Sequence, residues 1–284
     1  MNYPDIALQV PEVIIPSAEV ALDRWAVIAC DQYTSEPEYW ERVHGDVGDA
    51  PSALNLVLPE AHLERPDRNE RIAGIGRRME AFLDDGVLQQ LEPGFVLIDR
   101  QTPRAASRKG LLVALDLDRY DYGRNSRSLI RPTEGTVVSR LPPRIEIRRG
   151  ALLELPHVMV LIDDPERTVI EPLFAGVEQP LYDVELMQGG GHVRGWLVSD
   201  RSTQDRVAQS LRRLLPTAAG DAMLYALGDG NHSVAAAKEV WEETGRSAPE
   251  RGGDHPARHV LVELVNVHDE GMTLEPIHRL LTGG

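Results

Sequence analysis

The residue types best suited to chemistry lie together in the hexapeptide GDGNHS, residues 228–233, which we call the GDGNHS turn. An apolar run precedes it and a strong helix pattern follows it, so it joins a strand to a helix. Glycine allows positive φ and close approach to a ligand, and the first turn of a helix offers unpaired N–H groups at the positive end of its dipole. The pattern therefore predicts that the amides of residues 230–234 bind an anion such as phosphate.

Side chains of the turn extend this prediction. His232 is a candidate for proton transfer, and Asp229 is a candidate catalytic carboxylate and magnesium ligand. The residues expected to bind phosphate or a nucleotide are Gly228, Gly230, Asn231 and Ser233. The alternative is a tight strand-to-helix connection in which Asn231 or Ser233 caps the helix. The motif lacks both the GxxxxGK spacing of a P-loop and the full GxGxxG of a dinucleotide site.

A second group of charged residues runs from residue 131 to residue 148. Its arginines are Arg131, Arg140, Arg144 and Arg148, and Glu134 stands among them in the segment RPTEGT. Guanidinium groups match phosphate oxygens, so the first three arginines are candidate phosphate ligands. Glu134 is a candidate for orienting or deprotonating a hydroxyl group. The alternative is a polar edge strand on which Arg144, Glu146 and Arg148 share one solvated face.

Candidate metal ligands occur elsewhere. His255, His259 and Glu263 would resemble a zinc site on a helix, but residues 259–267 have the pattern of a central strand. In a strand, residues four positions apart lie about 13 Å from each other, so we expect no zinc. Asp163-Asp164 suits either magnesium or an Asp-Pro turn. The residues expected to be structural are Cys30, His157 and His278.

Composition places the chain among enzyme-like globular proteins. It has 284 residues, 42% of them hydrophobic and only 5% aromatic. Such a core favours helices covering a sheet, so we expect an α/β fold with a mixed sheet, with α+β as the alternative. The chain is expected to form one compact unit, or two lobes over residues 1–105 and 106–284.

The charge balance narrows the range of partners. The formal net charge is −15 and the isoelectric point is near 5.0, which argues against nucleic acid as a partner. The basic stretch 140–149 suits a small phosphorylated ligand as well as a nucleic-acid patch. A single cysteine, no signal-like N-terminus and no apolar run of about 20 residues predict a cytoplasmic protein away from membranes. Nothing in the sequence indicates the number of subunits.

Periodicity predicts the elements that must position these groups. Helices are expected over residues 36–43, 69–88 and 203–215 and after the GDGNHS turn. Strands are expected over residues 13–16, 25–29, 95–100, 110–117, 158–162 and 259–267. The strands at 95–100 and 110–117 should form a hairpin, and residues 118–128 should form a loop.

Four segments resemble a bacterial family known as the domain of unknown function 1015: WAVIACDQYTSEPEYW, IRPTEGTVVSRLPPR, GDGNHSVAAAK and EPIHRLL. They cover nearly the whole chain in the expected order. Members of this family tend to be encoded beside serine-biosynthesis enzymes, which implies a role in serine or phosphoserine metabolism. Relatives continue well past EPIHR, which implies that a C-terminal portion is missing here.

The GDGNHS turn is also similar to the DGHHR signature of the ParB and sulfiredoxin superfamily, in which this turn binds nucleotide phosphates. The likeness implies a ParB/sulfiredoxin-like core with large additions. Asp229, Gly230, Asn231 and His232 match the signature, but Ser233 replaces its arginine. Arg140 or Arg144 would then have to supply the missing positive charge.

The sequence therefore leads to two functional hypotheses. The first is a phosphotransfer enzyme, similar to a serine kinase or a phosphoserine phosphatase, that uses ATP or ADP with magnesium. Its partner would be a small phosphorylated ligand held at the GDGNHS turn. The second is a non-catalytic nucleotide or metabolite sensor that uses the same turn as a switch.

Overall fold

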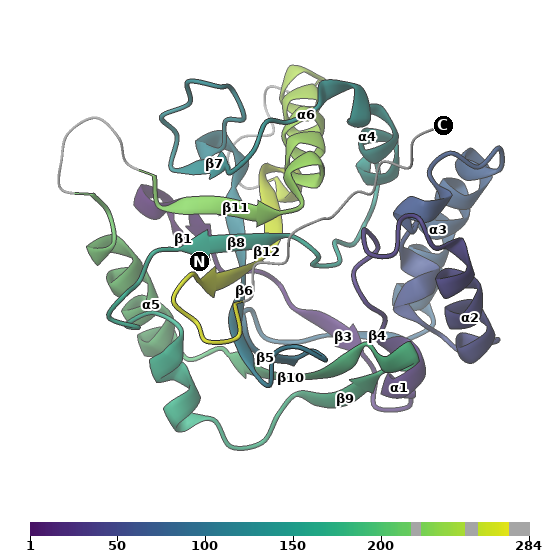
Figure 1. Ribbon diagram of the computed structural model, residues 1–284, viewed down its shortest axis with the longest axis horizontal. Helices are drawn as coiled ribbons and strands as arrows, with labels where there is room; N and C mark the ends of the chain where they lie inside the picture. The colour runs from purple at the N-terminus through teal and green to yellow at the C-terminus, as the bar shows by residue number, and fades with distance from the viewer. Residues whose placement is uncertain (217–222, 248–254, 273–284) are drawn as a thin grey trace, which may run out of the picture.

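The computed structural model describes residues 1–216, 223–247 and 255–272. Within these residues, a sheet of ten strands forms the centre of the molecule (Figure 1). Eight strands follow the order β7-β11-β8-β12-β6-β5-β10-β9, while β2 pairs with β6 and β1 pairs with β2. The pairs β7–β11 and β8–β12 are parallel, and the other pairs are antiparallel. The sheet is therefore mixed and helices cover it, which confirms the predicted α/β class.

The strands of this sheet are β1 (Asn2–Tyr3), β2 (Leu8–Gln9), β5 (Phe95–Gln101), β6 (Arg108–Asp116), β7 (Ile130–Pro132), β8 (Met159–Ile162), β9 (Tyr182–Leu186), β10 (Gly191–Val198), β11 (Tyr225–Asp229) and β12 (His259–Asn266). A separate two-stranded sheet consists of β3 (Ile14–Pro16) and β4 (Leu88–Gln90). The β5–β6 hairpin was predicted, and its strands pair from Val96–Leu112 to Arg100–Arg108. The boundary considered between two lobes, at residue 105, lies in the loop of this hairpin; the division into lobes stays a prediction.

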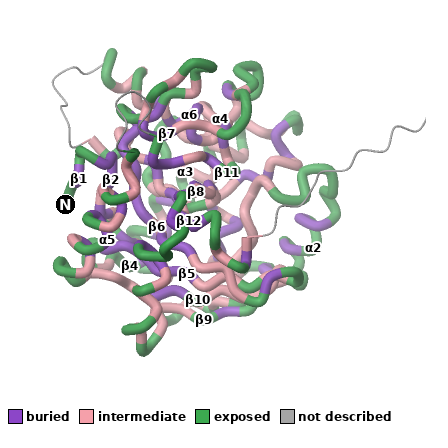
Figure 2. Tube along the Cα trace, turned by 60° about the vertical axis from the view of Figure 1, so that its left-hand side comes forward, coloured by how far each residue is buried: buried purple, intermediate pink, exposed green. Residues whose placement is uncertain are grey.

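The helices are α1 (Leu22–Trp25), α2 (Pro37–Val47), α3 (Arg68–Asp84), α4 (Pro142–Arg148), α5 (Arg201–Arg213) and α6 (Asn231–Ser247). Helices α5 and α6 cover the sheet, because Leu211 of one and Val234 of the other belong to its main apolar core. Helices α2 and α3 lie beside the sheet, at the right of Figure 1, around separate apolar clusters that contain Trp40 and Phe82. Figure 2 shows that buried residues follow the central strands, whereas exposed residues occupy the outer loops.

One predicted strand and one alternative considered from sequence are wrong. Trp25 ends α1, and residues 26–29 have no regular structure. Val27 and Ile28 pack against the cluster around Trp40, so this apolar run buries its side chains against a helix instead of pairing with a strand. The polar edge strand considered for residues 140–149 is helix α4, because proline at its first two positions has the φ that begins a helix.

The topology brings three chain segments to one edge of the sheet. Strand β7 runs parallel to β11, and β8 runs antiparallel to β11. The ends of β7 and β11 and the start of β8 therefore lie together, and α6 begins at the same place. Helix α4 packs along α6 above this edge (Figure 1).

Candidate functional site

The predicted strand, GDGNHS turn and helix are confirmed as β11 and α6, joined at Gly230. Gly230 has a φ of +82°, and a Cβ at this position would lie 2.9 Å from Cγ2 of Val158. A Cβ on Gly228 would lie 3.0 Å from Cγ of Leu161. The positive φ of Gly230 therefore favours glycine at that position, whereas at Gly228 a larger residue would crowd the side chain of Leu161 on β8.

The turn pairs some of its own amides and leaves others without a protein acceptor. The amides of Ser233 and Val234 donate to the Gly230 carbonyl at 3.0 and 3.1 Å, and the Gly230 amide donates to Oδ1 of Asp229 at 2.8 Å. Within the described residues, the amides of Asn231 and His232 have no acceptor. Of the amides of residues 230–234 that the sequence predicts to bind an anion, these two remain without a partner in the described part of the chain.

Glu134 lies beside the turn because β7 leads directly to it. The amide and hydroxyl of Thr133 both donate to the Leu227 carbonyl, at 3.3 and 2.7 Å. The side-chain amide of Asn231 donates to the Glu134 carbonyl at 3.4 Å. Glu134 is exposed, so its carboxylate can meet a ligand from solvent.

Asn231 is the buried polar residue of this edge. Its side chain lies at the start of α6 and only 4% of the residue is exposed. Its Oδ1 has no hydrogen-bond partner among the described residues. A buried acceptor without a donor is costly, and a donor group or cation of a ligand would satisfy it.

His232 is surrounded by charged groups of both signs. Burial lowers the pKa of His232, the positive charges of Arg140 and Arg144 lower it further, and the carboxylates of Glu60 and Glu134 oppose this shift. The ring is therefore neutral at pH 7. Its Nε2 accepts a hydrogen bond from the amide of Val137 at 3.2 Å, so its Nδ1 carries the proton.

The predicted arginines do not all lie at this site. Arg144 forms an ion pair with Glu60 in which the side chains are 10% and 17% exposed, and it also donates to the Arg140 carbonyl. Arg140 is exposed at the same edge. Arg131 instead donates to the Ser126 carbonyl at 3.1 Å, in the loop before β7.

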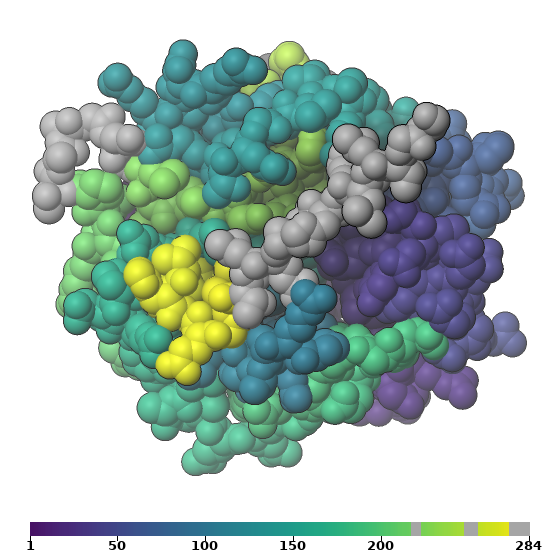
Figure 3. All heavy atoms as spheres, viewed as in Figure 1, coloured from purple at the N-terminus to yellow at the C-terminus, as the bar shows by residue number. Residues whose placement is uncertain are grey.

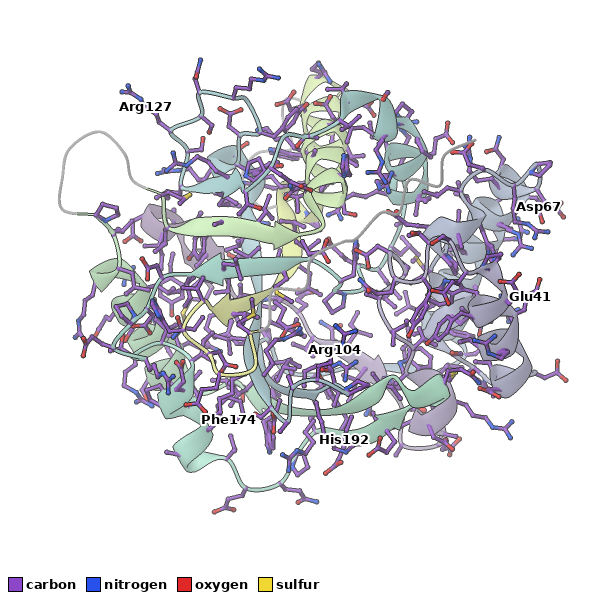
Figure 4. The ribbon with its side chains drawn as sticks, viewed as in Figure 1. Glu41, Asp67, Arg104, Arg127, Phe174 and His192 are labelled. Atoms are coloured by element: carbon purple, nitrogen blue, oxygen red, sulfur yellow. The ribbon has the colours of Figure 1, made fainter. Side chains whose placement is uncertain are left out.

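That loop extends away from the sheet. Figure 4 shows Arg127 pointing outward from it. The labelled residues His192 and Phe174 lie at the end of the molecule opposite to α6 in the same view.

A serine–histidine pair lies on the side of the turn nearest β8. Nε2 of His157 is 2.8 Å from the hydroxyl oxygen of Ser233, and Nδ1 of His157 is 3.3 Å from the Leu155 carbonyl oxygen. Both residues are half-buried. The histidine thus connects the segment before β8 to the first turn of α6.

The N-terminal part of the chain adds carboxylates to this edge. The Glu60 amide donates to the Cys30 carbonyl at 2.8 Å, so Glu60 and the segment that contains Asp31 lie together. Burial raises the pKa of Asp31, His157 opposes the rise, and the negative charges of Asp229 and Glu60 add to it. Figure 3 shows N-terminal residues, in purple and blue, beside the teal residues of α4.

Cys30 is not available as a nucleophile. Burial raises its pKa to about 12, and the charges of Asp31 and Glu60 contribute in the same direction. The thiol therefore stays protonated at neutral pH.

Three residues of this edge were missed as functional candidates from sequence: Asp31, Glu60 and His157. Asp31 belongs to the segment WAVIACDQYTSEPEYW, so its position in a shared motif was a usable signal. For His157 the only signal was its position at the end of an element, directly before the predicted strand 158–162. Glu60 carries no local signal, because only folding brings it to Arg144.

The residues considered for metals have other partners. His259 and Glu263 lie on strand β12, as predicted, and Glu263 binds Arg108 through both carboxylate oxygens, at 3.1 and 3.0 Å. Asp164 accepts hydrogen bonds from the amides of Thr168 and Val169. In the described part of the chain, no group of three or more histidine, cysteine or acidic side chains is arranged to hold a metal ion.

A comparison with protein families gives one match. The model of the DUF1015 family, described as a protein of unknown function, matches residues 14–284. The chain belongs to the DUF1015 family. The matched range includes every residue of the GDGNHS turn and its neighbours Asp31, Glu60, Glu134 and His157. EPIHRLL, the last segment that carried the resemblance, lies outside the described residues.

No curated protein and no solved structure shows a significant match to this DUF1015 chain. None of the helices in the described ranges combines the length and apolar character needed to cross a membrane.

Proposed function

We propose that this protein is a phosphotransfer enzyme that acts on a small hydroxylated metabolite, such as serine or phosphoserine, with the phosphate held at the GDGNHS turn. The observation that carries the proposal is the environment of His232 at the start of α6, where burial lowers the pKa of the ring, Arg140 and Arg144 lower it further, and Glu134 opposes the shift. Phosphoryl transfer requires mainly positioning and charge neutralisation, and these groups supply both.

The phosphate would be bound by the start of α6 and by Arg140. The amides of Asn231 and His232 supply two donors at the positive end of the helix dipole. Within the described residues, Arg140 is exposed and its side chain forms no ion pair, so its guanidinium can turn toward a phosphate. The Nδ1–H of neutral His232 adds a donor without a full charge.

Glu134 would orient or deprotonate the hydroxyl group of the acceptor. Its carbonyl accepts a hydrogen bond from the Asn231 side chain, and the residue is exposed beside the GDGNHS turn. The unpaired Oδ1 of Asn231 is suited to a hydroxyl or ammonium donor of the metabolite. Serine carries both kinds of donor.

The nucleotide hypothesis assigns magnesium to Asp229. Magnesium binds one or two carboxylates together with phosphate oxygens and water, and Asp229 is exposed. The negative charge of Asp229 raises the pKa of Asp31, so a cation bound at Asp229 would relieve repulsion between these carboxylates. When bound with ATP or ADP, the ion would neutralise phosphate charge.

The test is turnover by the purified chain. Serine with ATP or ADP, and phosphoserine alone, are each supplied with magnesium, and products are followed by phosphorus NMR. We expect one combination to give product. No product from any of them would refute the proposal.

Glu134→Gln then tests the site. We expect it to lower kcat by about a hundredfold or more while ligand affinity changes little. The matched control is Glu41→Gln, because Glu41 is exposed on α2, far from α6 in Figure 4. Equal activity of the two variants would remove Glu134 from the mechanism.

A second candidate function is a sensor without catalysis. One contact favours it, because Nε2 of His232 accepts a hydrogen bond from the Val137 amide. Val137 and the next residue, Val138, are 48% and 64% exposed. A ligand at the turn could therefore alter an exposed apolar segment. A sensor would show a thermal shift with a nucleotide, would lose it in Asp229→Ala, and would give no turnover in the wild type.

A further inference from the structure

The Ser233–His157 pair has the geometry of an activated nucleophile. A carbonyl oxygen can only accept a hydrogen bond, so Nδ1 of His157 carries a proton and donates to Leu155. Nε2 therefore presents its lone pair to the Ser233 hydroxyl, 2.8 Å away. Histidine in this tautomer accepts the proton of a serine that attacks an electrophile.

The surroundings of the pair suit the charges that such an attack creates. Ser233 lies in the first turn of α6, where the helix dipole stabilises negative charge on the incoming phosphate. Asp31 lies within electrostatic reach of His157 and would stabilise the imidazolium that forms after proton transfer. Both members are half-buried, so protein surrounds the pair without enclosing either residue completely.

We infer that Ser233 is the covalent nucleophile of this site and that His157 is its general base, an inference that rests on the proposed phosphotransfer function. The Ser233 oxygen attacks phosphorus, the new O–P bond forms, and the bond to the leaving oxygen breaks with its electron pair on that oxygen. Nε2 of His157 takes the serine proton and passes it to the leaving group.

The second half of the reaction reverses these roles. A metabolite hydroxyl oriented by Glu134, or a water molecule, attacks the phosphorus of phosphorylated Ser233, and its proton goes to Nε2 of His157. The Ser233–phosphorus bond breaks, and His157 returns the proton to the serine oxygen. The reaction needs no oxidant or reductant. One phosphoryl group leaves the donor and passes through Ser233 to the metabolite or to water.

The competing interpretation is a structural hydrogen bond that joins the segment before β8 to α6. It predicts a loss of stability when either partner is changed, but no covalent intermediate. The two interpretations therefore differ in whether phosphorus becomes attached to Ser233.

The experiment uses the full chain with phosphoserine, or with ATP and serine, each with magnesium chloride. Reactions are stopped in acid on the millisecond scale, and each sample is measured for product, for intact protein mass and for modified peptides. We expect one phosphoryl group on the peptide that contains Ser233, formed at least as fast as product.

Variants separate chemistry from structure. Ser233→Ala should abolish labelling and lower turnover by more than about a thousandfold, while still binding inorganic phosphate. His157→Gln should slow labelling, because the serine hydroxyl loses its proton acceptor. Ser202→Ala is the matched control, because Ser202 lies in the first turn of α5 and bonds Asp200 instead of a histidine; it should keep labelling and turnover.

The outcomes distinguish this inference from the proposed function. Turnover without labelled Ser233, together with an active and folded Ser233→Ala, would overturn the inference and leave phosphotransfer standing. Inversion of configuration at a chiral phosphorus would also overturn the inference, because two successive displacements through Ser233 retain the configuration. If every donor gives no product and no labelled protein, both the inference and the proposed function are wrong.

Discussion

Two strand ends of the sheet carry an acidic residue followed by polar residues, yet they are built differently. At the end of β8, only 1% of Asp164 is exposed, and its Oδ2 accepts the amides of Thr168 and Val169 at 2.6 and 2.8 Å. Asn266 completes this turn by donating to the Asp164 carbonyl at 2.8 Å and accepting from the Asp164 amide. At the end of β11, Asp229 is exposed and Oδ1 of Asn231 has no partner among the described residues.

The difference shows which polar turn is structural and which is available to a ligand. Strands β8 and β11 are antiparallel, so the two turns lie at opposite edges of the sheet, as their arrowheads in Figure 1 show. The β8 turn uses its polar groups internally, because buried donors and acceptors must be paired. The β11 turn leaves groups unpaired, and these can bind something else.

The largest effect is expected from Asp164→Ala. Removing this carboxylate leaves the amides of Thr168 and Val169 without their acceptor, so the free energy of unfolding should fall by about 3 kcal/mol. Urea unfolding measures it. The neighbouring control is Asp163→Ala, whose side chain is 84% exposed and which should cost less than about 1 kcal/mol. Equal losses in the two variants would contradict the comparison.

Gly230→Ala should have the next largest effect, on the other turn. The substitution places a Cβ at positive φ and 2.9 Å from Cγ2 of Val158, which should cost about 2 kcal/mol of stability and weaken phosphate binding. Gly245→Ala is the matched control in the same helix, because its Cβ would meet no described atom within 4 Å and alanine favours helices. It should stabilise the protein by about 0.5–1 kcal/mol. A neutral Gly230→Ala would show that the turn is not held in this shape.

The turns also show where sequence reasoning succeeds. The β11 strand, the glycine turn and α6 were predictable, because an apolar run, two glycines and a helical pattern are local signals. The alternation of Arg144, Glu146 and Arg148 suggested a strand, but two prolines at the start of the segment favour the observed helix.

The contacts across the site could not be predicted in the same way. The Arg144–Glu60 and His157–Ser233 pairs join residues that are 84 and 76 positions apart, and no local pattern encodes them. Whether a polar residue is satisfied is likewise a tertiary property. Asp164 and Asp229 look alike in the sequence, and only the packed neighbours of each decide its role.

Two buried asparagines sharpen the comparison further. Asn266 donates to the Asp164 carbonyl and to Oε1 of Glu171, both at 2.8 Å, whereas Asn231 has one bond of 3.4 Å. Asn266→Ala should therefore cost about 2 kcal/mol, and Asn231→Ala less than about 1 kcal/mol. Only the second should weaken binding of serine or phosphoserine in a titration. A larger stability loss for Asn231→Ala would mean that its polar group is already satisfied.

The smallest expected effect is a change in the protonation of His232, measured by NMR. Burial and the positive charge of Arg140 hold the pKa of His232 below its ordinary value of about 6.5. A histidine whose pKa is lower in the folded state contributes stability above about pH 6.5, and this contribution is lost as the pH falls through the folded pKa. Protonation also removes the acceptor of the Val137 amide.

Arg140→Gln should raise the pKa of His232, because the positive charge of Arg140 lowers that pKa more than any other charge around the ring does. Inorganic phosphate should raise it in the wild type, since an anion at the start of α6 favours the charged ring. Arg127→Gln is the control, because Arg127 points outward from the loop before β7 in Figure 4. If phosphate leaves the pKa of His232 unchanged while binding elsewhere, the unpaired groups of the β11 turn do not form an anion site. The β8 and β11 turns would then differ only in how far their polar residues are exposed, and not in whether they bind an anion.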